Sequence, residues 1–419
     1  MFLTTDSRKT DDGTLPSEWR VDALGSLQPF VTSGSRGWAR FYAERGAPFI
    51  RITNLSRDSI YLNLADLKLV QLPPEDREGL RTQLQAGDLL VSITADIGII
   101  GYVDERVPQP AYINQHIALV RFDPSRVDSK FLAYFLSSAQ SQRLFSATTD
   151  IGAKAGMSLA GVLRIQSAFP ALPEQHAIAA ALSHVDALLE GLTRLIAKKR
   201  DLKQAAMQQL LTGQVRLTQF VGNWEARSLG EVCQKIQDGT HFSPKLGGGD
   251  FLYVTSRNIR FGRLDVSDAG RISSTEHDKI YARCDVRKGD LLLTKDGAST
   301  GNAALNNLDE PFSLLSSVAL LRFDRVRHNP LYFMYQLLSR GGQEQIRGLM
   351  SGNAITRLTL TKIRTLRFPV PILAEQEAIA AVLSDMDAEL EALEARREKT
   401  RALKQAMMQE LLTGRTRLV

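Results

Sequence analysis

The chain has 419 residues, enough for two domains with separate hydrophobic cores. Its hydrophobic fraction of 43% and charged fraction of 23% predict a globular protein, and the lack of an apolar leader or an 18-residue apolar run argues against secretion and a membrane span. Cys233 and Cys284 give neither a disulfide framework nor zinc spacing, so we expect a cytoplasmic protein. The net charge of +6 favours a polyanionic partner without establishing one.

In chain order, short apolar runs between turn signals predict the strands of a loop-rich mixed sheet at 48–55, 87–93 and 116–122. A short helical pattern follows at 129–138, and a long one covers about 174–211. The second half repeats this order, with apolar runs at 251–259, 289–295 and 317–323 and helical patterns at 330–339 and about 375–412. Gly213 and Gly414 indicate where the two long helices end.

The two halves also repeat each other in sequence. "LKQAAMQQLLTGQVRL" at 202–217 returns as "LKQAMMQELLTGRTRL" at 403–418, with 12 of 16 letters identical and an offset of 201 residues. "EQHAIAAALSHVDALLE" at 174–190 returns at 375–391 with the same offset. The protein is therefore two copies of one unit of about 200 residues.

The long helical patterns carry apolar residues at alternating spacings of four and three, which is typical of a coiled-coil seam: Ile178, Leu182, Val185, Leu189, Leu192 and Ile196, and Ile379, Leu383, Met386, Leu390 and Leu393. Charged residues also fall on the seam, so the packing should depart from ideal heptads: Lys199, Lys203, Arg397 and Lys404. An ordinary bundle helix in one compact core is the alternative. A 38-residue helix would be roughly 57 Å long, however, which favours pairing of the two helices with each other.

If the two long helices pack along their lengths, they must be antiparallel, and the second must return the chain to the first domain. We therefore predict an α+β fold with two pseudo-twofold-related mixed-sheet domains, separated by a pair of long antiparallel coiled-coil helices. The expected boundaries are 1–170 and 213–371 for the sheet domains, and 171–212 and 372–419 for the helices.

Catalytic motifs are missing from the sequence. It has no G-x-x-x-x-G-K-[ST] loop, no H-E-x-x-H and no C-x-x-C, and "QLPPED" at 71–76 lacks the Asp/Asn-Pro-Pro-aromatic pattern of an amino-methyltransferase. We expect no catalytic residue and no metal ligand, which favours a recognition protein over an enzyme.

The loops differ between the two copies while helices and framework strands match. They contain basic, hydroxyl, amide and aromatic residues, the types that contact phosphates and base edges, although surface loops also vary without function. The candidate DNA-binding residues are Ser35, Arg36, Arg40, Tyr42, Arg45, Gln115, Lys154, Lys235, Thr240, His241, Lys245, Arg257, Lys295, Ser299, Asn353 and Arg357.

The segments "LPSEWRVDALGSL", "PFIRITNL", "GDLLVSI", "ALPEQHAIAAAL" and "LKQAAMQQLLTG", each echoed in the second half, resemble the specificity subunit of type I restriction-modification enzymes. The resemblance implies that each sheet domain is a target-recognition domain for half of a split DNA site, and that the helices dock two methyltransferase subunits. Those subunits would use S-adenosylmethionine, and a motor-nuclease subunit would use ATP and Mg²⁺, so this chain itself would bind no cofactor.

For the docking of partner subunits we select residues on the two long helices: Gln175, Ala179, Gln204, Gln208, Gln376, Ala380, Gln405 and Gln409. Two other interpretations stay open. The chain could serve a fused methyltransferase-nuclease instead, or it could be a two-headed adaptor that binds no DNA.

Overall fold

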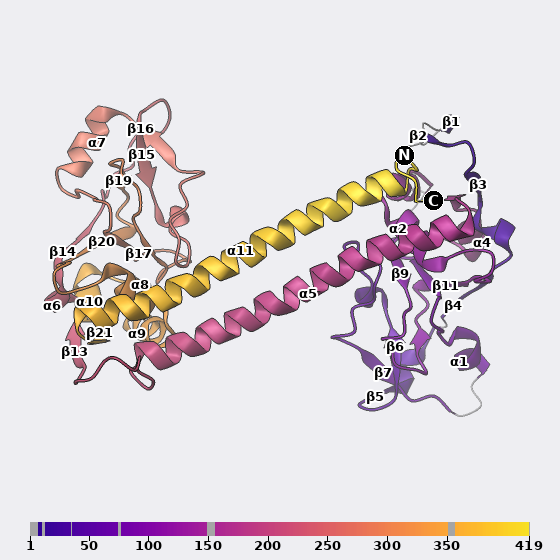
Figure 1. Cartoon of the computed structure of the whole chain (residues 1–419), viewed down its shortest axis with the longest axis horizontal. Coiled ribbons are helices and arrows are strands. Elements are labelled where there is room, and N and C mark those ends of the chain that lie inside the picture. The colour runs from indigo at the N-terminus through magenta and orange to yellow at the C-terminus, as the bar shows by residue number, and fades with distance from the viewer. Residues whose placement is uncertain are drawn as a thin grey trace. The chain divides into compact units, whose positions relative to one another are not determined.

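A computed structural model of the chain describes residues 7–10, 13–34, 36–73, 77–148, 156–350 and 357–418. The chain divides into two compact units (Figure 1), Met1–Leu192 with Arg396–Val419, and Thr193–Ala395. Each unit holds one sheet-containing part, which we call its head, together with segments of both long helices. Each unit is described here by itself.

The first unit contains the elements up to the long helix α5 (Leu172–Leu211). Its strands are β1 (Ser7–Thr10), β2 (Gly13–Pro16), β3 (Arg20–Ala23), β4 (Phe30–Ser33), β5 (Tyr42–Ala43), β6 (Ala47–Ile50), β7 (Lys68–Val70), β8 (Leu89–Ser92), β9 (Ile100–Tyr102), β10 (Tyr112–Ile113), β11 (Ile117–Arg121) and β12 (Gln166–Phe169). Its helices are η1 (Leu24–Leu27), η2 (Trp38–Phe41), η3 (Ile52–Asn54), α1 (Arg77–Thr82), α2 (Ser129–Ser137), α3 (Ala139–Thr148) and α4 (Leu159–Leu163).

The second unit repeats this order before the long helix α11 (Leu373–Leu411). Its strands are β13 (Glu225–Ser228), β14 (Cys233–Asp238), β15 (Phe251–Val254), β16 (Gly270–Ile272), β17 (Leu291–Thr294), β18 (Ala303–Leu305), β19 (Ser313–Leu314), β20 (Val318–Phe323) and β21 (Arg367–Val370). Its helices are α6 (Leu229–Val232), η4 (Ser256–Asn258), α7 (Ser274–Tyr281), α8 (Pro330–Leu338), α9 (Arg340–Met350) and α10 (Leu360–Thr365).

Each head is built on one antiparallel sheet, in the order β4-β11-β8-β9 in the first and β14-β20-β17-β18 in the second. A second sheet in each head includes a parallel pair, β6 with β10 and β15 with β19. The prediction of mixed-sheet heads is therefore confirmed. In the first head β3, near the start, pairs with β12, the strand that leads into α5. In the second head β13 pairs in the same way with β21, the strand that leads into α11.

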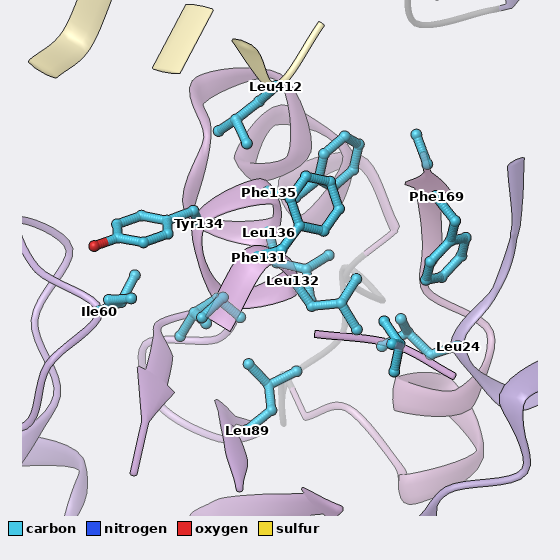
Figure 2. Packing of buried hydrophobic residues seen from close by; sticks show 14 of the residues in the cluster. Leu24, Ile60, Leu89, Phe131, Leu132, Tyr134, Phe135, Leu136, Phe169 and Leu412 are labelled. Carbon is cyan, nitrogen blue, oxygen red and sulfur yellow. The ribbon is translucent and has the colours of Figure 1, made fainter. Parts of the chain in front are cut away.

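The core of the first head forms where β8 packs under α2. All four residues of β8 are buried, because one face of the sheet is covered by α2 and the other by the second sheet's residues. Figure 2 shows Leu412, which follows α11, among the side chains of the buried cluster that also contains Phe131 and Phe135 of α2. The end of α11 is thus part of the first core, and Leu210 and Leu211 of α5 occupy the corresponding place in the second core.

The long helices end as the sequence predicts. Gly213 and Gly414 adopt left-handed φ values of 72° and 68°, which favour glycine after a helix. A Cβ on Gly414 would lie 2.3 Å from Pro16 Cγ, so the chain end packs against the beginning of the first head. The prediction that the second long helix returns to the first domain is confirmed.

Within each unit the segments of α5 and α11 run antiparallel. In the second unit Lys203 pairs with Asp387, and Lys199 pairs with Glu389 at 2.7 Å. The residue numbers therefore rise along α5 as those of their partners fall along α11. In the first unit Lys404 pairs with Asp186 at 2.7 Å. The lysines at the seam are accommodated because a carboxylate of the other helix pairs with each of them.

Candidate nucleic-acid interface

Loops from distant parts of the second head meet where its main sheet ends. Thr240 donates its backbone N–H to Leu314 (2.8 Å), and Lys295 donates its own to Ser317 (2.9 Å). The hydroxyl of Ser299 donates to the carbonyl of Ser256 (3.4 Å). These bonds gather candidates from four loops into one region, which we call the second strand-end cluster: Thr240, His241, Arg257, Lys295, Ser299 and Arg357.

A chain of alternating charges runs through the second strand-end cluster. The Lys295 ammonium lies 3.5 Å from Asp238 and 2.9 Å from Asp296, and Arg357 donates to Asp296 at 2.9 Å. Burial alone would raise the pKa of Asp296, but its hydrogen bonds with Arg357 and Lys295 outweigh burial and lower it. Asp296 is therefore a carboxylate near neutral pH, and Arg357 is the exposed end of the chain, with its side chain 53% exposed.

Three of the second head's candidates are not freely exposed. Thr240 is buried, and the Lys295 side chain is only 5% exposed and lies between two aspartates. Lys235, on the edge strand β14, has a side chain that is 32% exposed and pairs with Asp285 at 2.6 Å. Burial removes Thr240 and Lys295 from the proposed contact set, which corrects the sequence interpretation, and Lys235 stays a prediction.

The other candidates of the second head lie at the surface. His241 is exposed, with its ring 3.4 Å from Asp238. Lys245 and Arg257 are exposed, while Ser299 is half-buried. Lys245 is held through its backbone N–H, which donates to Glu276 at 3.0 Å, so its side chain is left at the surface.

In the first head the candidates divide between an exposed loop region and a strand end. Arg36, Arg40, Tyr42 and Arg45 are exposed around η2 and β5. Arg40 lies over the Phe41 ring, 4.7 Å from its centroid. This region presents three arginines and an aromatic ring, a composition suited to phosphates and bases.

Gln115 lies at the strand end of the first head. Its amide contacts the His116 ring at 3.0 Å, and the other ring nitrogen of His116 contacts Thr94. Ser35, Lys154 and Asn353, the remaining candidates, lie outside the described residues, so they stay predictions.

Four of the eight helix residues selected for docking are buried in their own unit. Gln175 accepts from the backbone N–H of Asp128 (3.0 Å) and donates to the Pro170 carbonyl (2.8 Å). Gln376 makes the equivalent bonds in the second unit, and Ala179 and Ala380 belong to the two cores. These four positions are therefore structural, which corrects the sequence interpretation.

The other four docking candidates, Gln204, Gln208, Gln405 and Gln409, are exposed. Gln204 and Gln208 line a groove of about 1380 Å³ in the second unit, between α5 and the head. Phe261, which is 59% exposed, lies on the head side of this groove. The groove joins an exposed aromatic ring to polar helix residues, as partner-binding surfaces do.

The sequence interpretation missed a buried ion pair at the start of each long helix. Arg417 donates to Glu174 at 2.6 and 2.7 Å, and Arg216 donates to Glu375 at 2.9 and 2.7 Å. A signal existed, because both arginines occupy the same place in the repeated segment and both glutamates open the other repeated segment.

Two further searches cover the described part of the chain. There, no group of three or more His, Cys, Asp or Glu residues is placed to hold a metal ion. Nor does any helix among the described residues have the length and apolarity needed to cross a membrane.

The fold and the divergent strand ends define a protein with two recognition heads. The family model described as type I restriction modification DNA specificity domain matches residues 16–198 and 222–400. These matches cover most of the chain, which therefore belongs to this family of non-catalytic specificity subunits.

Two relatives come from Methanocaldococcus jannaschii. The type I restriction enzyme MjaVIII specificity subunit is 24% identical over 61% of this chain and 63% of its own length, so that match spans less than two thirds of the relative. The putative MjaX specificity subunit is 22% identical over 98% of this chain and 96% of its own length.

Solved structures support the fold. The S subunit of a type I restriction-modification system from M. genitalium aligns with a TM-score of 0.60 at 17% identity, covering 94% of this chain and 96% of its own. A chain from a study of assembly and conformational transition of the type I system aligns with a TM-score of 0.52, also at 17% identity, covering 95% and 98%.

Proposed function

We propose that this chain reads a bipartite DNA target for a type I restriction-modification complex, with one half-site for each head. The observation that carries this proposal is the duplicated framework with different strand ends. In the second head, Arg357 pairs with Asp296, whereas the matching backbone bridge of the first head joins Thr94 to Gly156. Two heads with one scaffold and two surfaces suit two different half-sites.

We further propose that the exposed helix residues Gln204, Gln208, Gln405 and Gln409 contribute to docking two methyltransferase subunits. The groove beside Gln204 and Gln208 supports this docking role. In the assembled complex, S-adenosylmethionine would be used by the methyltransferase subunits for adenine methylation, and ATP and Mg²⁺ by the motor-nuclease subunits. The chain itself would bind no cofactor and would work in the cytoplasm.

The test is to express the chain with its methyltransferase subunits and to map methylated adenines across the genome with and without it. We expect methylation at one split sequence, only when the chain is present. Purified complex should bind duplexes of that sequence, with an affinity that falls linearly on a log scale with salt. Salt-independent binding, or no binding, would indicate an adaptor, and co-purification with one fused enzyme would indicate the other partner class.

The long helices would set the unread spacer between the half-sites. Inserting four residues after Leu192 and four after Leu393 adds about one turn, or about 5.4 Å, to each helix. Since one base-pair step is about 3.4 Å, we expect the methylated spacer to lengthen by one or two base pairs while the half-sites stay the same. An active enzyme with an unchanged spacer would show that the helices do not set the distance.

A further inference from the structure

The guanidinium of Arg357 is fixed in orientation at the end of the second head's main sheet. Its Nε donates to Asp296 Oδ1 at 2.9 Å, and its Nη2 donates to Oδ2 at 3.4 Å. The backbones of Asp296 and Arg357 form a β-bridge, and the next residue, Leu358, is buried and donates its N–H to the Lys295 carbonyl. Both the backbone and the side chain of Arg357 are thus restrained.

Asp296 is in turn held from the interior. Lys295 donates to Asp296 Oδ2 at 2.9 Å, and Lys295 also lies 3.5 Å from Asp238, whose side chain is only 8% exposed. Burying Lys295 and Asp238 costs desolvation free energy, and an ion pair at the surface avoids this cost. The buried pair fixes the carboxylate that orients Arg357.

The orientation leaves one edge of the guanidinium available. Nε and one N–H of Nη2 point to Asp296, so the end formed by Nη1 and the second N–H of Nη2 remains. Among the described residues, the hydrogen bonds of Arg357 all go to Asp296, and the side chain is 53% exposed. Such an end can donate two parallel hydrogen bonds to O6 and N7 of guanine in the major groove.

We propose that Arg357 reads a guanine in the half-site bound by the second head, and that Asp296 is its positioning residue. This inference rests on the proposed DNA-reading function and adds the base and the residue that reads it. A contact to a single phosphate oxygen would need the charge of Arg357 but not its fixed plane, whereas a bidentate contact to guanine needs both.

In the described part of the first head, a glycine replaces the arginine at this place. Gly156 stands where Arg357 stands in the second head, bridged to Thr94. The nearby Arg57 cannot replace it, because its Nη1 donates to Gln142 at 2.5 Å and its Nη2 donates to Asp96 and to the Ile97 carbonyl. The proposal therefore concerns one half-site only.

The first measurement is a methylation map made with the full complex carrying Arg357→Lys, Arg357→Ala or Asp296→Asn. We expect all three variants to accept other bases at one guanine of the second half-site and to leave the first half-site unchanged. The matched control is Arg287→Ala, which also removes an exposed arginine that pairs with an aspartate, Asp285. Arg287 precedes β17, whereas Lys295 follows the other end of that strand. The control should keep the wild-type motif.

The second measurement begins with the wild-type complex, whose decisive result does not depend on the folding of any variant, and then repeats the comparison with Arg357→Ala. Replacing that guanine by 7-deazaguanine removes N7, and we expect the affinity of the wild-type complex for the duplex to fall about tenfold. The Arg357→Ala complex should bind the guanine and 7-deazaguanine duplexes with the same affinity. If specific binding persists but every guanine of the second half-site tolerates the replacement, or the half-site holds no guanine, this inference is wrong. If the wild-type complex binds no specific sequence, the proposed function itself fails.

Discussion

The two units repeat their framework contacts almost one for one. Each equivalent pair joins the same kinds of side chain at similar distances: Arg121–Asp88 at 2.7 Å and Arg322–Asp290 at 2.8 Å, and Tyr134–Asp186 at 2.6 Å and Tyr335–Asp387 at 2.8 Å. The strand ends do not repeat, because the first head places Thr94 and Gly156 where the second places Asp296 and Arg357. Contacts that recur in both units therefore identify the scaffold, and contacts that differ identify candidate recognition surfaces.

The largest effect should come from breaking the buried ion pairs that open the long helices. Arg417→Ala leaves Glu174, 2% exposed, without its arginine and should lower the free energy of unfolding by about 3–5 kcal/mol. Arg216→Ala does the same to Glu375, 1% exposed, and should also destabilise the fold. Trp224 also donates to Glu375 at 3.1 Å, whereas Trp19 Nε1 is buried without a partner among the described residues.

Among the described residues, Glu375 keeps one donor after the change and Glu174 keeps none, so we expect Arg417→Ala to be the more destabilising variant, by about 1 kcal/mol. Urea unfolding of both variants measures the difference. Equal losses, or a larger loss for Arg216→Ala, would show that the tryptophan bond does not distinguish the two units.

A smaller and equal effect is expected at the tyrosines that bind the helix aspartates. Tyr134→Phe and Tyr335→Phe each remove a hydrogen bond to a carboxylate, which should lower stability by about 1.5–3 kcal/mol. Tyr253→Phe is the control, since its buried hydroxyl has no partner among the described residues and its loss should not destabilise. Unequal losses at the first two positions would contradict a shared framework.

Acid should distinguish the two units. Burial alone would raise the pKa of Asp285, but hydrogen bonds with Lys235 and Arg322 lower it, and burial raises the pKa of Asp88 in the first unit. A lowered carboxyl pKa stabilises the fold above the ordinary value of 3.8, and this is lost as the pH falls below it; a raised pKa has the opposite sign. We expect the free energy of opening measured by hydrogen exchange to fall for the second unit, relative to the first, as the pH is lowered through this range, and Asp285→Asn to reduce that pH dependence.

The smallest effect is expected at exposed ion pairs between the helices. Lys199→Ala removes a pair with Glu389 whose side chains are 30% and 47% exposed, so the change in stability should stay below about 1 kcal/mol. The same urea unfolding measures this change. A loss of stability as large as that of Arg216→Ala would contradict the expectation that an exposed ion pair contributes little to stability.

The sequence predicts the periodic parts of this fold and not the meeting of its loops. Apolar spacing locates α5, α11 and the strands β8 and β17, because burial of a helix stripe or a sheet face requires that spacing. The pattern could not show that Gln175 bonds to the head's backbone, since a glutamine on a helix looks the same whether it faces solvent or a loop.

The candidate recognition residues illustrate the same limit. Residue type correctly identified Arg357 as an exposed cation but also selected Lys295, which is buried between two aspartates. Asp238 and Asp296 lie 58 residues apart in the chain, and their approach depends on the pairing of β14 and β17 with β20. Only the tertiary structure brings them together.

The most direct test of the account is a chain with two copies of the second head. Residues 20–169 would be replaced by residues 225–370, because the pairings Arg20↔Phe169 and Glu225↔Val370 give matched junctions and leave both long helices unchanged. Methylation mapping with the methyltransferase subunits should then find a target in which the half-site of the second head occurs twice. A target that keeps the first half-site, or one that shares no half-site with the wild type, would contradict the claim that each head reads its half of the DNA independently.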